Sequence, residues 1–217
     1  MDGTIIDSEP YWIEAETELV EEFGGSWTQE QAYSLVGSGL WNSAKAIQHA
    51  GVDLSADEVV RRLSDRVLGR IEASVPWRAG SQELIGEIVE AGIPCALVTM
   101  SLRANAEAVA SAIAAALGAE VFSVIVSGDD VTEPKPNPEA YLMAADQLGV
   151  AIEHTVALED SAYGAASAFS AGAVTIGVPL HVDVPRHTAH VLWDTIEGKG
   201  VDDIRREFAR HARVAAS

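Results

Sequence analysis

The sequence is poor in cysteine and has no long apolar run, and each shortage excludes a class of protein. Its one cysteine, Cys95, cannot form an internal disulfide, so we expect a reducing compartment and predict a cytoplasmic protein. No apolar stretch reaches the roughly 18 residues of a membrane helix, and the N-terminus is acidic where a secretory signal would be basic. We therefore expect no association with membranes.

Positive charge is scarce as well. There are 14 Lys and Arg residues against 33 Asp and Glu, for a formal net charge of -19, which repels phosphate backbones and anionic lipid. Neither nucleic acid nor a membrane is an expected partner. The few lysines are Lys45, Lys135 and Lys199. With 217 residues and 48% hydrophobic content, the chain can still bury a sizeable core.

The first third of the chain has the periodicity of helices. Apolar residues recur there at spacings of three and four, which predicts a small helical bundle. The predicted helices span residues 11–23, 29–35, 43–49 and 56–71. Two capping-box spacings, Thr28 with Gln31 and Ser55 with Glu58, mark helix starts.

From residue 77 onward, short apolar runs alternate with helical segments that end in glycine. The predicted strands span residues 94–100, 121–127, 155–158, 173–178 and 191–193, with helices at 81–91, 105–117, 138–148, 162–171 and 202–217. We expect Asn137 to cap the third of these helices. Such alternation predicts an α/β fold, a Rossmann-like, doubly wound parallel sheet that is covered on both faces.

Ligands of such sheets bind beyond the carboxyl ends of the strands, so the residues that follow each strand are candidates for a site. Glu159 and Asp160 follow one apolar strand and offer hard oxygen donors that suit Mg²⁺. A purely structural alternative is that Asp160 or Ser161 caps the next helix. Acidic residues also follow a second strand, at Asp129 and Asp130.

Two further segments suit an anion. Lys135 lies between Pro134 and Pro136, which stiffen the backbone and present its ammonium to one phosphate or carboxylate oxygen; a solvated loop lysine is the alternative. Thr99 and Ser101 end a strand just before a helix, where hydroxyls and free N–H groups form an anion cradle. Alone, that hydroxyl pair is a weak signal, because Ser and Thr begin many helices.

In their order, these segments resemble the motifs of the haloacid dehalogenase superfamily, in the subgroup of β-phosphoglucomutase and phosphatases with a helical cap. Residues 1–4, Met-Asp-Gly-Thr, match motif one, Asp-x-Asp-Gly-Thr, from its second position. Thr99 matches motif two, Lys135 with its Pro-x-Pro matches motif three, and residues 158–161, Leu-Glu-Asp-Ser, match motif four. The resemblance covers nearly the whole chain.

This resemblance implies a domain organisation and one departure from the family. The core would comprise residues 1–8 and 77–217, and the mobile cap residues 9–76. The family nucleophile, the first Asp of motif one, would precede Met1, together with the strand, usually the central one, that carries it. We expect that the sequence begins within motif one and that the functional chain extends upstream. The alternative is a truncated relative that binds phosphate without turnover.

The resemblance also implies an activity and its residues. We expect a Mg²⁺-dependent phosphatase that acts on a small phosphorylated metabolite, such as a sugar-phosphate-like monoester, through an aspartyl-phosphate. Asp2 would serve as general acid and base, with Thr99 and Lys135 as further catalytic residues. The residues expected at the phosphate are Thr99, Met100, Ser101 and Lys135. Those expected at the metal are Asp2, Glu159 and Asp160.

The cap residues favour a phosphatase over a phosphosugar mutase, which remains an alternative. A mutase of the β-phosphoglucomutase kind would have a cap histidine near the position of Trp12, and a basic pair in the loop around residues 36–40; neither is present. The candidate specificity residues are Trp12, Gly37, Leu40 and Trp41. Packing of a small bundle is the other role open to the tryptophans. We expect a monomer, with a dimer as the alternative.

Overall fold

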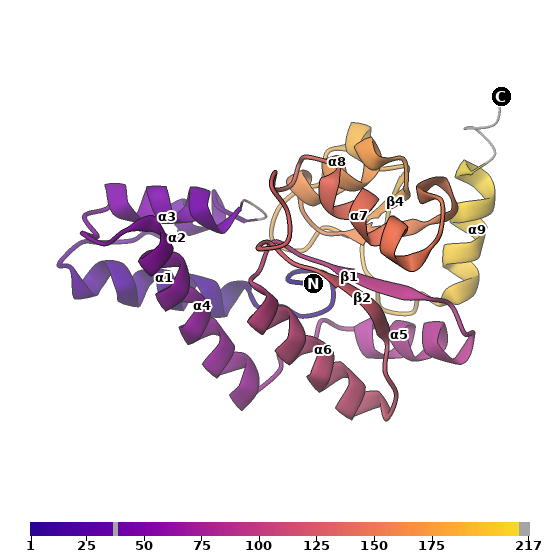
Figure 1. The fold of residues 1–217 in the computed structure, drawn as a ribbon, viewed down its shortest axis with the longest axis horizontal. Helices are drawn as coiled ribbons and strands as arrows, with labels where there is room; N and C mark the ends of the chain where they lie inside the picture. Colours follow the sequence, from indigo (N-terminus) through magenta and orange to yellow (C-terminus); the bar gives the residue numbers. More distant parts are fainter. Residues whose placement is uncertain (37–38, 213–217) are drawn as a thin grey trace.

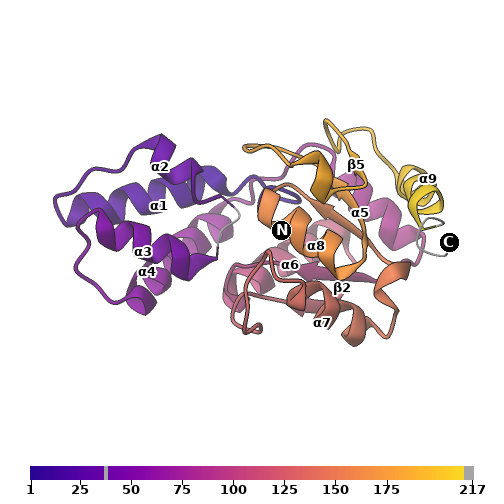
Figure 2. The same ribbon diagram turned by 90° about the horizontal axis from the view of Figure 1, so that it is seen from above.

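The computed structural model describes residues 1–36 and 39–212 and divides them between two lobes (Figure 1). One lobe consists of helices only, and the other is layered from helices and strands. The first residues of the chain lie at the junction of the two lobes (Figures 1 and 2). Within the described ranges, no helix combines the length and the apolar character that a membrane crossing needs.

Local sequence signals explain where the helices of the first lobe begin. These helices are α1 (Glu9–Glu22), α2 (Gln29–Tyr33), α3 (Leu40–His49) and α4 (Ala56–Ala73). The predicted box of Thr28 and Gln31 is formed in both directions at the start of α2. At α4, Ser55 accepts from the Glu58 N–H as predicted, but the Glu58 carboxylate binds Arg61 instead of reaching back to the cap.

The second lobe confirms the predicted α/β class. Its elements are α5 (Ser81–Glu90), β1 (Cys95–Val98), α6 (Arg103–Leu117), β2 (Phe122–Val126), α7 (Glu139–Leu148), β3 (Val156–Glu159), α8 (Ala162–Ala171), β4 (Val174–Gly177), β5 (Val191–Leu192) and α9 (Val201–His211). Every strand pair is parallel. Helices α5 and α6 lie on one side of the strands, and α7 and α8 lie on the other (Figure 1).

Many predicted helix boundaries differ from the structure by one to three residues, and two of the helices need comment. The helix predicted from residue 138 begins at Glu139 with Pro138 at its N-cap position, so Asn137 is not the cap residue; its Oδ1 accepts from the Glu139 N–H at 3.0 Å. The terminal helix ends at His211, and residues 213–217 of the predicted helix lie outside the described residues.

The described strands form two separate sheets, β1–β2 and β3–β4–β5, so β1 and β3 each pair on one side only. Of the four residues of β1, only Leu97 is buried, whereas all four of β4 are buried between two neighbours. Cys95, the first residue of β1, is accordingly half-buried. That a central strand of the family fold is missing from this sequence stays a prediction.

The two lobes share one hydrophobic cluster. It contains Trp12 and Leu19 of α1 and Val67 of α4, together with Val109 and Ile113 of α6. A buried hydrogen bond joins α6 to α4, because Asn105 Nδ2 of α6 donates to the Ser64 carbonyl of α4 at 3.3 Å. The lobes therefore pack through α4 against α6, and this contact fixes one wall of the space between them.

We predict that Ser64→Ala stabilises the protein. The Ser64 hydroxyl is buried and finds no hydrogen-bond partner among the described residues, so it retains the cost of losing water. Its removal is expected to raise the free energy of unfolding in urea by about 1 kcal/mol. Ser161→Ala is the matched control, because that buried hydroxyl accepts from the Gly164 N–H at the start of α8. The control is expected to lose about 1 kcal/mol, and an equal loss in Ser64→Ala would contradict the prediction.

Candidate active site

A pocket lies between the two lobes, at the carboxyl ends of β1 and β3. It brings together most of the residues predicted from the sequence to form a site. These are Asp2, Trp12, Leu40, Thr99, Met100, Ser101, Lys135, Glu159 and Asp160. Segments far apart in the sequence therefore meet at one place, as the strand-end rule for parallel sheets requires.

Other predicted residues are not brought to this pocket. Trp41, expected at the substrate, does not line it; its indole is 39% exposed and donates to Asp57 Oδ1 of α4 at 2.8 Å. Gly37 lies outside the described residues. Asp129 and Asp130 are held away by Arg103, because Asp129 Oδ1 accepts from its main-chain N–H and Asp130 Oδ2 from its guanidinium.

Asp2 occupies a cradle of hydroxyl groups. Its Oδ2 accepts from Ser101 Oγ at 2.8 Å and from Thr99 Oγ1 at 3.4 Å. Its Oδ1 accepts from Ser8 Oγ and lies 3.5 Å from Nε1 of Trp12, which belongs to the first, helical lobe (the cap lobe). The hydroxyls of the first strand end thus converge on one oxyanion, which is the geometry that a phosphate oxygen requires.

Lys135 forms a buried ion pair and is not a solvated loop residue. Its Nζ donates to Glu159 Oε1 at 2.6 Å and to the Val98 carbonyl at 3.2 Å, and both charged side chains are only 7% exposed. The Tyr141 hydroxyl donates to the same Glu159 oxygen. Burial and the neighbouring Glu159 raise the pKa of Tyr141 well above its usual value, so it stays a donor. Glu159 is therefore committed to these donors.

Asp160 faces the turn formed by the first residues. Its Oδ1 accepts from Thr4 Oγ1 at 2.8 Å in a buried hydrogen bond. Gly3 has a φ of 67°, which favours glycine, and a Cβ at this residue would overlap the Asp160 carboxylate. Backbone conformation and space therefore both require glycine here. Burial, with the adjacent Glu159 charge, raises the pKa of Asp160 to about 6. Motifs one and four thus meet through Gly3, Thr4 and Asp160.

The carboxylates predicted at the metal do not form one cluster in this structure. Among the described residues, no group of three His, Cys, Asp or Glu side chains is placed to bind a metal ion. The reason is that Glu159 is paired with Lys135, while Asp2 is held by Ser101. Mg²⁺ needs only one or two protein carboxylates when waters and a substrate phosphate complete its shell. Asp160 supplies such a donor, so the chemistry of the site fits Mg²⁺.

The cap side of the pocket contains two carboxyl groups that were not predicted. Glu9 and Glu16 line it together with Trp12. The three residues are spaced by three and four along α1 and share one helix face, which is the signal by which helical periodicity around Trp12 could have found them. Glu16 is buried, and its Oε2 accepts from Trp27 Nε1 at 2.9 Å.

Two basic residues near the pocket were also missed. His181, in the loop after β4, lines the pocket; its Nε2 lies 2.6 Å from Asp7 Oδ1, and its ring stacks on Tyr33 of the cap lobe. Arg78 is buried and donates to the Gly3 carbonyl at 2.5 Å and to the Val178 carbonyl at 2.7 Å. Arg78 thus fixes the turn next to Asp2 against the end of β4. Nothing in the local sequence marks either residue.

Fold and pocket together define an α/β protein with a helical lobe beside a pocket that hydroxyl and carboxyl groups line. Residues 1–178 match the family of haloacid dehalogenase-like hydrolases, and the chain belongs to that family.

Similar proteins include named phosphatases. Protein CbbY of Cereibacter sphaeroides is 32% identical over 180 residues, which cover 79% of this chain and 78% of that protein. The fructose-1-phosphate phosphatase YqaB of Escherichia coli (strain K12) is 30% identical over 192 residues, covering 83% of this chain and 94% of YqaB. The crystal structure of CbbY from Rhodobacter sphaeroides in complex with phosphate has a TM-score of 0.82 at 29% identity, with 94% of this chain and 96% of that chain covered.

We predict that stability falls as the pH rises from about 5 to 8. Burial raises the pKa of Glu16 to about 7, and burial with the nearby Glu16 and Asp2 charges raises that of Glu9 to about 8. A carboxyl with a raised pKa in the folded state binds its proton more tightly there. Its contribution to the free energy of unfolding is fully present at pH values below the ordinary pKa of 4.5. That contribution is lost as the pH rises through the pKa of the folded state.

Urea unfolding over this pH range tests the prediction. Glu16→Gln cannot ionise, so its free energy of unfolding is expected to fall less with pH than that of the unchanged protein. Glu14→Gln is the control, because Glu14 lies on the same helix, is exposed and pairs with Arg70; it is expected to keep the full slope. Equal slopes for the unchanged protein and Glu16→Gln would contradict the assignment.

Proposed function

We propose that this chain is a phosphatase that removes phosphate from a small phosphorylated metabolite with Mg²⁺ as cofactor. The observation that carries the proposal is the convergence of the Thr99 and Ser101 hydroxyls on a single carboxylate oxygen, in a pocket that also contains Lys135. Membership of a hydrolase family and the named phosphatases among its relatives support the same reading. A sugar-phosphate-like monoester is the proposed substrate class.

In this proposal the end of β1 holds the phosphate. The Thr99 and Ser101 hydroxyls donate to phosphate oxygens in place of Asp2, and the main chain at Met100 lies between them. Met100 also accepts from the Lys135 N–H through its sulfur at 3.3 Å, which places the lysine segment against this strand end. The Lys135 ammonium stabilises negative charge that spreads over the phosphate oxygens during transfer.

Asp2 is the proposed general acid and base. Its carboxylate lies between the hydroxyl cradle and Trp12 of the cap, so it borders both the phosphate and the leaving alcohol. It would protonate the alcohol as the bond to phosphorus breaks, and then accept a proton from the attacking water. Mg²⁺, which Asp160 would hold, supplies positive charge at the phosphate.

The proposed nucleophile is an aspartate two positions before Asp2, in a chain extended upstream. This part of the proposal is supported by the motif that residues 1–4 match from its second position. Among the described strands, β1 and β3 each have one unpaired edge, which is compatible with one further strand between them. Attack on phosphorus would give an aspartyl-phosphate that water then hydrolyses.

We predict Mg²⁺-dependent release of phosphate from p-nitrophenyl phosphate by a chain extended in frame upstream, and none by the 217-residue chain. A metal chelator is expected to abolish the activity. In the extended chain, Asp2→Asn is expected to lower kcat by about 100-fold or more, because the general acid and base is lost. Comparable activity in the short chain would contradict the position of the nucleophile. No turnover by either folded chain would favour a non-catalytic phosphate-binding protein.

Phosphate binding is predicted for the chain as given. Calorimetric titration with inorganic phosphate is expected to show a single site, and Ser101→Ala is expected to weaken it by about tenfold, the effect of one charge-assisted hydrogen bond. Ser123→Ala, an exposed serine of β2, is the control and is expected to leave the affinity unchanged. Equal affinity in the Ser101 and Ser123 variants would remove Ser101 from the phosphate site.

A further inference from the structure

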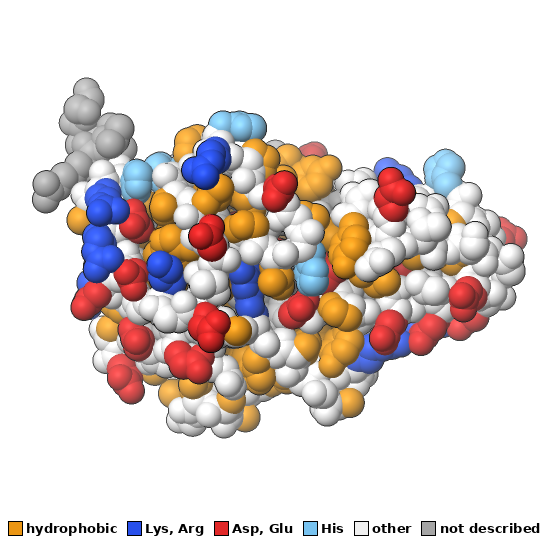
Figure 3. Space-filling view, turned by 180° about the vertical axis from the view of Figure 1, so that it is seen from behind, with side chains coloured by type: hydrophobic (Ala, Val, Ile, Leu, Met, Phe, Trp, Pro, Cys, Tyr) orange, Lys and Arg blue, Asp and Glu red, His pale blue; other side chains and the backbone are white. Residues whose placement is uncertain are grey.

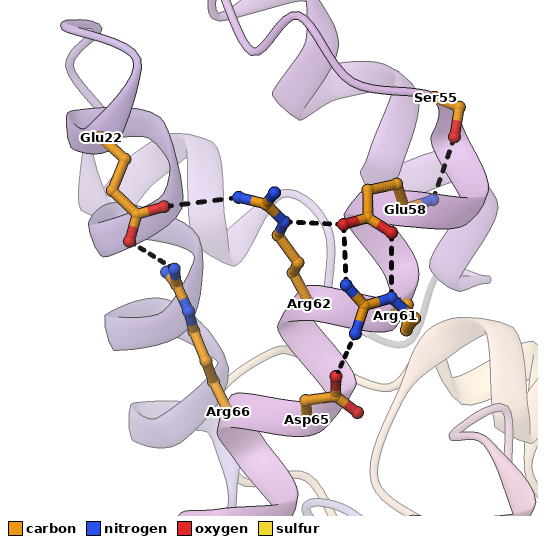
Figure 4. Close-up of polar contacts among 7 residues, drawn as sticks. All are labelled: Glu22, Ser55, Glu58, Arg61, Arg62, Asp65 and Arg66. Carbon is orange, nitrogen blue, oxygen red and sulfur yellow. Dashed lines mark hydrogen bonds and ion pairs between the residues drawn. The ribbon is translucent and has the colours of Figure 1, made fainter.

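The arginines of α4 in the cap lobe form ion pairs on the outer surface of this lobe. Arg62 and Arg66 of α4 reach Glu22 of α1, and Arg61 binds Glu58 and Asp65 along its own helix (Figure 4). Arg70 likewise pairs with Glu14 and Glu18. Lys45 is exposed.

The cap side of the pocket therefore has no positive charge among its described residues. The basic side chains that line the pocket are Lys135 and His181, which both come from the α/β lobe. Each already faces a carboxylate, Lys135 that of Glu159 and His181 that of Asp7. Figure 3 shows acidic side chains spread over both lobes on one face of the molecule.

Glu16 is the side chain on this wall that most requires a partner. It is only 5% exposed, and the described part of the chain gives its carboxyl one hydrogen bond, from Trp27. Glu9 lies close enough to Glu16 for the charge of Glu16 to raise the pKa of Glu9. The cap wall also includes the apolar side chains of Leu40 and Leu63 and the polar side chain of Ser43. Two carboxyl groups thus share the cap wall of the pocket, and among the described residues no basic side chain of the cap lobe lies on that wall.

We propose that the pocket selects a phosphomonoester whose alcohol carries a protonated amine, with Glu16 and Glu9 receiving the ammonium group. The inference rests on the proposed function, since the phosphate of the same molecule would bind at Thr99 and Ser101. An ammonium is a compact donor that can hydrogen-bond to both carboxyl groups and offset the charge of one of them in a low-dielectric site. Trp12, which also lines the pocket, is an aromatic side chain of the kind that attracts a cation.

The same wall discriminates against other leaving groups. Once Glu9 and Glu16 are ionised, a second phosphate or a carboxylate on the alcohol would meet like charge there, and such repulsion is an effective source of specificity. A neutral hydroxyl can donate a hydrogen bond to Glu16, but it brings no charge to offset the buried carboxylates. We therefore expect amine-bearing phosphates to bind better than hydroxyl-bearing phosphates of equal size.

Calorimetric titration of the 217-residue chain with matched ligands tests this inference. The probes are aminoalkyl phosphates with chains of two to four carbons, each paired with the hydroxyalkyl phosphate of the same length, and inorganic phosphate. The length series allows for the unknown span between the phosphate and Glu16. At the best length, the amine is expected to bind about tenfold more tightly than its hydroxyl partner, the effect of one charge-assisted hydrogen bond.

Variants separate this inference from the proposed function. Glu16→Gln is expected to bring the amine preference below about threefold while the affinity for inorganic phosphate stays unchanged, since the carboxylate charge is lost but the cradle is kept. Glu14→Gln, on the outer face of the same helix, is expected to keep the full preference. Equal binding of amine and hydroxyl ligands, or a preference that survives Glu16→Gln, would overturn the inference alone. Failure of every ligand and of inorganic phosphate to bind would overturn the proposed function and the inference with it.

Discussion

The site depends on one buried ion pair between Lys135 and Glu159. Glu159 ends β3, and the Lys135 ammonium also binds the carbonyl of Val98, which ends β1. Since β1 and β3 belong to different sheets, a single cation joins the carboxyl ends of both. Removal of either charged partner would leave the other buried and unpaired, which typically costs about 3–5 kcal/mol. The pair therefore works as a unit that fixes the position of each strand end, and with it the pocket.

Two glycines give the acidic pair the space that it needs. A Cβ at Gly164 would overlap the Glu159 carboxylate, and a Cβ at Gly3 would overlap that of Asp160. The adjacent acids thus point to different partners, Glu159 to Lys135 and Asp160 to the turn at Thr4. Neighbouring residues of a strand end point to opposite sides, so one acidic pair can support both the sheets and the pocket. Any side chain at either glycine would have to displace a buried carboxylate.

Local signals predicted most of the fold and the core side of the site. The box at Thr28, the glycine-closed helices and the residues at strand ends depend on near neighbours in sequence, and the structure contains them. Long-range partners could not be predicted in this way. Arg78 binds carbonyls 75 and 100 residues away, and the exposure of Trp41 follows from the position of Asp57 on another helix. Glu9 and Glu16 needed only the helix face of Trp12, so they were predictable in principle.

Helix α1 carries two sets of acidic residues, one paired with arginines and one without such partners among the described residues. Its outer face carries Glu14, Glu18 and Glu22, which pair with arginines of α4 at exposed positions, where salt screens the interaction and each pair contributes little. Its inner face carries the half-buried Glu9 and the buried Glu16, and no ion pair joins either of them to a basic residue in the described part of the chain. One helix therefore separates compensated charge from uncompensated charge. Because the uncompensated part faces the same pocket as the hydroxyl cradle, the two ends of the pocket favour opposite charges on a ligand.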